Sequence, residues 1–146
     1  MVIDYYCIIR VRNTIIQLYM EIWIFEDSEQ SRKVFKQLLF KILGDQLTIK
    51  EAESMDQANA LLEKPGMTVN IVFIDGNLSP VITKKGEEGR ILERKTRSLY
   101  PTALIIDISL YGNALENPDF RCPKDSRLSE KEVVIRQAVE VAKLKG

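Results

Sequence analysis

The chain has 146 residues, of which 45% are hydrophobic, so it is long enough for one ordinary domain with a single core. Its 21 basic and 21 acidic side chains balance, which argues against a nucleic-acid-binding protein, because such domains usually carry a basic surplus. It contains no histidine, and this excludes Ser-His and Cys-His catalysis as well as histidine-ligated metal sites.

The first segment, residues 1–19, is apolar but interrupted by charged side chains. The uninterrupted runs are too short to span a membrane, and no small-residue cleavage site marks a signal peptide. We expect an appendage of unknown role: an extra strand, a partner-binding arm or a frayed end, with Met20 as a possible natural start. Cys7 and Cys122 make neither a disulfide framework nor a zinc site, so the expected location is the cytoplasm.

From residue 20 onward, short apolar runs alternate with segments in which apolar residues recur at helical spacing. Continuous apolar runs are typical of strands that are covered on both faces. The predicted strands are 22–25, 47–52, 70–74, 103–108 and 120–122. The predicted helices lie between Ser28 and Gly44, over 56–63, over 87–99 and from about Ser129 onward. This alternation predicts an α/β fold with a parallel sheet wrapped by helices on both faces.

The predicted helices carry further expectations. We expect Ile91, Leu92 and Leu99 on the buried side of the helix over 87–99. Ser129 and Glu132 have the spacing of a capping box at the start of the last helix. The inner face of that helix is predicted to consist of Val133, Val134, Ala138, Val141 and Ala142.

Three acidic residues come directly after two of the most apolar strands. Glu26 and Asp27 follow the strand 22–25, and Asp75 follows the strand 70–74. Parallel strands end at the same edge of a sheet, where doubly wound folds bind their ligands. Three carboxylates would repel each other there, so the sequence predicts a hard cation that neutralises them.

Each of these residues also has an ordinary structural interpretation. Asp27 could cap the following helix, and Asp75 could begin a simple turn. Ser109 could cap the end of the strand over 103–108. Asp107 lies within that apolar strand, where it could pair with a nearby cation or mark a partly open strand. Lys84 and Lys85 are expected in a solvated loop over 76–86.

The order of these residues resembles the receiver domain of two-component response regulators, over residues 20 to 144. That family has an acidic pair after its first strand, here Glu26 and Asp27, and a phosphorylated aspartate after its third, here Asp75. A serine or threonine follows its fourth strand, here Ser109, and a lysine directly before a proline follows its fifth. The resemblance implies a single flavodoxin-like doubly wound domain over 20–146, with strand order 2-1-3-4-5.

The resemblance also implies a function. Asp75 would accept a phosphoryl group from a histidine kinase or phosphotransfer protein, and Ser109 and a lysine would contact that group. Mg²⁺ would be held by Glu26, Asp27, Asp75 and the backbone carbonyl of Asn77. A change at a protein-binding face would pass the signal to a downstream protein. Slow autodephosphorylation and a homodimer are compatible with this function, whereas nucleic acid and membrane partners are not expected.

The sequence departs from the family in the long loop after Asp75, whose glycine comes late, and at three further places. It reads Arg121-Cys122-Pro123-Lys124, so the lysine follows the proline. Alignment on the proline puts Cys122 in the place of the lysine, whereas alignment on the lysine makes Lys124 the equivalent, which we prefer. Leu110 stands where the family has a very small residue and would crowd the phosphoryl pocket. The interval from Ser109 to Lys124 is too short for a full helix, so we expect the fourth helix to be shortened or absent.

Three functions remain open from the sequence. The first, which the acidic triad favours, is a stand-alone receiver-like domain that is phosphorylated on Asp75. The second is a degenerate receiver that binds proteins without phosphorylation, and the altered lysine motif, Leu110 and the shortened fourth helix favour it. The third is a small Mg²⁺-dependent phosphohydrolase on the same fold.

Overall fold

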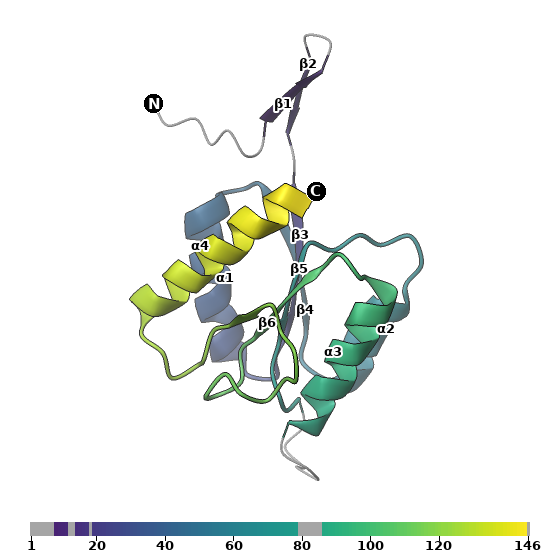
Figure 1. Cartoon of the computed structure of the whole chain (residues 1–146), viewed down its shortest axis with the longest axis vertical. Coiled ribbons are helices and arrows are strands. Elements are labelled where there is room, and N and C mark those ends of the chain that lie inside the picture. The colour runs from purple at the N-terminus through teal and green to yellow at the C-terminus, as the bar shows by residue number, and fades with distance from the viewer. Residues whose placement is uncertain (1–7, 12–13, 18, 79–85, 146) are drawn as a thin grey trace.

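A five-stranded parallel sheet forms the centre of the molecule (Figure 1). The computed structural model describes residues 8–11, 14–17, 19–78 and 86–145. The elements are β1 (Ile8–Val11), β2 (Thr14–Gln17), β3 (Met20–Phe25), α1 (Glu29–Leu43), β4 (Leu47–Ala52), α2 (Met55–Glu63), β5 (Ile71–Ile74), α3 (Glu87–Leu99), β6 (Leu104–Asp107), β7 (Phe120–Arg121) and α4 (Leu128–Lys145). The central sheet has the order β4-β3-β5-β6-β7, which is 2-1-3-4-5 when its own strands are counted along the chain. The predicted fold is therefore confirmed.

Helices cover both faces of this sheet, with α1 and α4 on one side and α2 and α3 on the other (Figure 1). Successive side chains of a strand point to opposite faces. In β3, Ile22 and Ile24 pack with α1 and α4, whereas Trp23 and Phe25 pack with α2 and α3. All four side chains are fully buried, which explains why the strand is apolar without alternation.

The start of α4 differs from the prediction. The helix begins one residue before Ser129, and the N–H of Arg127 donates to Glu130 Oε2 over 3.2 Å. The predicted capping box of Ser129 and Glu132 is therefore wrong. Glu132 instead forms an ion pair of 2.5 Å with Lys41 of α1, so its carboxylate joins the two helices.

The buried faces of α3 and α4 also differ in part from the prediction. Leu92 is buried as expected, but Ile91 is 41% exposed, Leu99 is 48% exposed and Val133 of α4 is 56% exposed. All three side chains were predicted to face inward, and these predictions are wrong. Besides Leu92, the residues buried on α3 are Gly89, Glu93 and Thr96.

The connection from β6 to β7 contains no helix. Residues 108–119 run as turns and irregular backbone. The described residues thus form four helices, and the prediction that the fourth helix of a receiver is shortened or absent is confirmed. The two-residue strand β7 forms an edge of the sheet.

The N-terminal segment forms a hairpin of its own. Strands β1 and β2 pair antiparallel in a separate two-stranded sheet, which projects from the body of the molecule above β3 (Figure 1). The role of this hairpin stays open, as the sequence left it.

Cys7, Lys84 and Lys85 lie outside the described residues. Among the helices that the structure describes, none combines the length and apolar character needed to cross a membrane.

Candidate functional site

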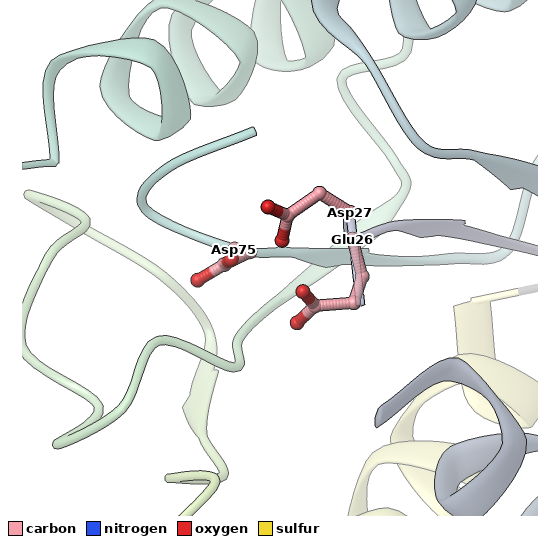
Figure 2. A group of neighbouring side chains, drawn as sticks. All are labelled: Glu26, Asp27 and Asp75. Atoms are coloured by element: carbon pink, nitrogen blue, oxygen red, sulfur yellow. The ribbon is translucent and has the colours of Figure 1, made fainter. Parts of the chain in front are cut away.

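The ends of β3 and β5 bring three carboxylates together. Phe25 and Ile74, the last residues of these strands, are paired in register, and the N–H of Asp75 donates to Phe25 O over 2.9 Å. Glu26 and Asp75 therefore leave the sheet side by side, with Asp27 next in the chain. Figure 2 shows the three side chains grouped there, and one oxygen of each lies within 4.8 Å of the others. The predicted acidic cluster is present.

The cluster is mostly closed to solvent. Glu26 is fully buried and Asp75 is 6% exposed, whereas Asp27 is exposed. Burial, reinforced by the charge of Asp75, raises the pKa of Glu26 to about 8. Burial also raises the pKa of Asp75, although the nearby ammonium of Lys124 opposes the shift. Ionising both carboxylates is therefore costly unless a cation is close.

Lys124 supplies such a cation from the loop after β7. Its Nζ donates to Asp75 Oδ2 over 3.0 Å and lies 2.6 Å from Glu26 Oε2, in ion-pair contact but outside hydrogen-bond geometry. Burial lowers the pKa of Lys124, but the contacts with Glu26 and Asp75 outweigh burial and raise it. The ammonium is thus held in its charged form between the carboxyl groups of Glu26 and Asp75.

The backbone explains how a lysine after the proline reaches this place. Cys122, the alternative on the proline alignment, is fully buried in the core between the sheet and α4, where burial raises the pKa of its thiol to about 11. The N–H of Lys124 donates to Ser109 O over 3.2 Å, which ties the loop to the end of β6. Of the two predicted candidates, the structure brings Lys124 to the carboxylates, while its chemical role stays a prediction.

Ser109 lies beside the loop that carries Asp75. A Cβ built on Gly76 would lie 3.6 Å from Ser109 Cβ, and Ser109 is only 6% exposed. Its hydroxyl accepts a hydrogen bond from the N–H of Ala114 over 3.3 Å, so it caps the turn that follows. Leu110, which was predicted to crowd the phosphoryl pocket, is 52% exposed.

The structure distinguishes between two interpretations of Asp27. Ser28 is the N-cap of α1, because its Oγ accepts from the N–H of Ser31 over 3.3 Å. Asp27 is therefore not the helix cap.

Asn77 uses its side-chain Oδ1 to accept from the N–H of Gly86 over 3.0 Å, and its backbone carbonyl remains only a predicted metal ligand.

Asp107 pairs with a cation, one of the two possibilities left open by the sequence. This fully buried carboxylate lies 3.2 Å from Arg121 Nη1 and accepts backbone hydrogen bonds of 2.9 Å from Ser109 and Leu115. Asp107 thus holds the segment that follows β6 at its start and again at Leu115. The same segment is held at its far end by the buried Glu93, whose oxygens accept from the N–H groups of residues 116 and 117.

Two further residues of the site were not predicted. Arg32 of α1 is buried, and its Nη1 donates to the carbonyls of Glu26 over 2.7 Å and Asp27 over 3.1 Å. Lys131 of α4 is buried in a similar way against the loop of Lys124. The only signal in the sequence is a charged residue in each amphipathic helix, and that signal is too common to identify them.

Comparisons by sequence find no relative: no protein-family model matches the chain, and no curated protein matches it significantly. Comparisons of structure do find similar proteins. A CheY-like response regulator receiver domain from Methanospirillum hungatei JF-1 has a TM-score of 0.65 at 20% identity and covers 88% of this chain and 99% of its own.

Two other solved structures agree with it. A CheY-like receiver domain from Methylobacillus flagellatus has a TM-score of 0.61 at 22% identity, with coverage of 82% of this chain and 98% of its own. The phosphorylated cyanobacterial phytochrome response regulator RcpA has a TM-score of 0.64 at 14% identity, with coverage of 84% and 92%. The chain therefore has the fold of response regulator receiver domains.

Proposed function

We propose that the protein accepts a phosphoryl group on Asp75 from a histidine kinase or phosphotransfer protein and signals through a change at a protein-binding face. The observation that carries the proposal is the position of Lys124 Nζ, 2.6 Å from Glu26 Oε2 and 3.0 Å from Asp75 Oδ2. One ammonium and a group of carboxylates thus meet at the edge of the sheet. This combination suits the transfer of a phosphoryl group to a carboxylate, which depends on positioning and charge.

In the proposed reaction, a carboxylate oxygen of Asp75 forms a bond to phosphorus while the bond from phosphorus to the donor imidazole nitrogen breaks. The imidazole keeps the electron pair of the broken bond and takes up one proton from solvent, so it leaves neutral. The ammonium of Lys124 pairs with a phosphoryl oxygen, and the hydroxyl of Ser109 donates to another.

The residues present suit a bound Mg²⁺. Its ligands would be carboxylate oxygens of Glu26, Asp27 and Asp75 and the backbone carbonyl of Asn77, all of them the hard oxygen donors that this ion prefers. The fit is supported by the three carboxylate oxygens within 4.8 Å of one another and by the raised pKa of the two buried members. When bound, the ion supplies positive charge that neutralises the carboxylates and the phosphoryl oxygens.

Ser109 links the reaction to the protein surface. Its hydroxyl accepts the N–H of Ala114 when no phosphoryl group is present. If this hydroxyl turns toward a phosphoryl oxygen, that hydrogen bond is lost and the segment after β6 is freed at one point. Leu110 and Tyr111 of this segment are 52% and 58% exposed, so a downstream protein can contact them.

A second candidate function is a degenerate receiver that binds proteins without phosphorylation. The specific observation in its favour is the connection from β6 to β7, in which a helix is replaced by a segment fixed by the buried carboxylates of Asp107 and Glu93. A segment held at both ends resists a rearrangement on phosphorylation. This function needs no Mg²⁺ and no chemistry at Asp75.

One experiment separates the two candidates. The protein is incubated with Mg²⁺ and a small phosphoryl donor such as acetyl phosphate, and its intact mass is measured. Phosphoryl acceptance predicts an added phosphoryl group that is lost in Asp75→Asn and retained in Asp45→Asn, an exposed aspartate after α1. Absence of the adduct, or its persistence in Asp75→Asn, would show that Asp75 is not the acceptor.

A further inference from the structure

We propose that Lys131 is a positioning residue that fixes the loop of Lys124, so that the Lys124 ammonium lies between Glu26 and Asp75. The inference rests on the proposed function for its chemical meaning, because Lys124 is the residue through which Lys131 acts. In the part of the chain that the structure describes, the ammonium of Lys131 donates to backbone and hydroxyl oxygens of the loop and not to the carboxylates of the site.

The contacts of Lys131 are directed at one short segment. Its Nζ donates to Lys124 O over 2.8 Å, to Ser126 O over 2.5 Å and to Ser126 Oγ over 3.2 Å. An ammonium has three N–H donors, and this loop supplies an acceptor for each of them. The hydrogen bonds of Lys131 therefore hold residues 124–126 against the start of α4.

The position of Lys131 is costly for an ammonium group. The residue is 6% exposed, and burying a charge is expensive unless it is paired or hydrogen-bonded. It is also the fourth residue of α4, close to the helix end that carries a partial positive charge. Within the part of the chain that the structure describes, no carboxylate forms an ion pair with it, so the three loop oxygens are what offset this cost.

Hydrogen bonds hold the backbone of Lys124 at both its N–H and its carbonyl. Its N–H donates to Ser109 O over 3.2 Å, and its carbonyl accepts from Lys131. The next N–H, of Asp125, donates to Leu110 O over 3.2 Å. With its backbone held in this way, the side chain of Lys124 has a defined origin from which it reaches Asp75 Oδ2.

Arg32 holds the acidic side of the site by the same means. Its guanidinium donates to the carbonyls of Glu26 and Asp27, while Lys131 donates to the carbonyl of Lys124. Two buried cations from α1 and α4 thus hold the two loops whose side chains meet. The altered order of proline and lysine makes the clamp on Lys124 necessary, because Lys124 lies three residues beyond the end of β7.

The first test measures how exposed the Lys124 amine is to an acylating reagent, with the rate for each lysine followed by peptide mass spectrometry. In Lys131→Met, which keeps the length of the side chain but removes the donors, the acylation rate of Lys124 is expected to rise roughly tenfold. The rate for Lys95, on the far side of the sheet, stays unchanged. Lys33→Met, which removes an exposed lysine of α1, leaves the rate for Lys124 as in the wild type.

A milder variant serves if Lys131→Met fails to fold, which would be seen as faster acylation of all lysines together. Ser126→Ala removes one of the three acceptors of Lys131, together with the hydrogen bond that Ser126 Oγ donates to Pro123 O, and is expected to raise the Lys124 rate about twofold. Lys131→Arg retains donors for the same carbonyls, so Lys124 should be acylated in this variant at close to the wild-type rate. An unchanged Lys124 rate in folded Lys131→Met, or in Ser126→Ala where Lys131→Met does not fold, overturns the proposal.

The second test uses phosphoryl acceptance. Lys131→Met is expected to slow adduct formation on Asp75 in the wild-type background but not in a Lys124→Met background, because it acts through Lys124. Equal slowing in both backgrounds overturns the proposal. If the wild type forms no adduct, the proposed function fails, while a faster acylation of Lys124 in Lys131→Met still supports the positioning role.

Discussion

Lys124 Nζ and Oε2 of the fully buried Glu26 lie 2.6 Å apart, and the same ammonium donates to Asp75 over 3.0 Å. Burial makes both carboxyl groups expensive to ionise, and the one positive charge of Lys124 lies close enough to offset part of that cost for each of them. A divalent cation would use the same oxygens. Lys124 thus offsets the charge of these groups when no metal is bound, and it would compete with a metal bound there as proposed.

The first prediction concerns Lys124→Met. Without the ammonium, the three carboxylates should bind Mg²⁺ more tightly, by roughly tenfold, because the site becomes more negative by one charge. The metal-free protein should lose about 2 kcal/mol of its free energy of unfolding, a value below that for a fully buried pair because Lys124 is 22% exposed. Calorimetric titration with Mg²⁺ and urea unfolding in a chelator measure the two effects.

Lys33→Met is the matched control for this variant, since Lys33 is an exposed residue of α1. It should leave the Mg²⁺ affinity and the free energy of unfolding unchanged. Unchanged or weaker Mg²⁺ binding by Lys124→Met would contradict a competition between the ammonium and the metal.

The fold could be predicted from the sequence because its elements are local patterns. Apolar runs between amphipathic segments mark the central strands β3, β5 and β6, and Ser28 and Gly44 mark the ends of α1. The position of Lys124 could not be predicted in the same way, since Cys122-Pro123-Lys124 allows two alignments. Contacts between segments that are separate in the sequence decide between them, among them the hydrogen bonds from the N–H of Lys124 to Ser109 O and from Lys131 Nζ to Lys124 O.

The residues that sequence reasoning missed act through the backbone. Arg32 and Lys131 donate to backbone carbonyl groups. Every residue type has such a carbonyl, so the sequence does not show which ones accept these hydrogen bonds. Gly89 did leave a signal, because a glycine within the predicted helix 87–99 weakens that helix and indicates a close approach. The structure shows the approach: a Cβ on Gly89 would lie 2.6 Å from Asp75 O and 2.7 Å from Gly76 Cα.

The second prediction follows from that contact. Replacing a glycine inside a helix by alanine normally stabilises the protein by about 1 kcal/mol. In Gly89→Ala, the added methyl group meets the backbone of Asp75 and Gly76, which cannot rotate away. The substitution should instead lower the free energy of unfolding by about 2 kcal/mol and slow phosphoryl acceptance, because Asp75 is displaced.

Urea unfolding and the intact-mass assay measure these effects. Ser98→Ala, at an exposed position of the same helix, is the control and should change stability by no more than a few tenths of a kcal/mol. Stabilisation of the protein by Gly89→Ala would show that α3 can move away from the loop of Asp75 at no cost.

The third prediction concerns pH in the absence of metal. Burial and the charge of Asp75 raise the pKa of Glu26 from 4.5 to about 8, so the folded protein holds a proton that the unfolded chain releases near pH 4.5. The stabilisation that this proton provides is complete below 4.5 and is lost as pH rises toward 8. The free energy of unfolding should therefore fall with rising pH across this window, by at most about 1.4 kcal/mol per pH unit for one proton.

Urea unfolding in a chelator at several pH values measures the slope, and Glu26→Gln, which cannot ionise, should reduce it. Saturating Mg²⁺ should also reduce the slope, because a bound cation keeps Glu26 ionised in the folded protein. An equal slope in the wild type and in Glu26→Gln would assign the pH dependence to other groups.

The fourth prediction tests how the segment without a helix is held. Asp107 is fully buried, and its carboxylate accepts from the N–H groups of Ser109 and Leu115 and pairs with Arg121. In Asp107→Asn, the amide nitrogen must face one of these donors, so at least one buried hydrogen bond is lost along with the charge. The free energy of unfolding should fall by about 3 kcal/mol.

Hydrogen exchange locates this effect. The Leu115 amide, which donates to Asp107 Oδ2 over 2.9 Å, should exchange faster in Asp107→Asn, while amides of β3 change only as much as global stability does. Asp45→Asn, at an exposed position after α1, should alter neither quantity. If Leu115 stays protected in Asp107→Asn, then Glu93 and Arg121 hold the segment without Asp107. A segment fixed that firmly would not follow Ser109 toward a phosphoryl group, and this would favour binding without phosphorylation.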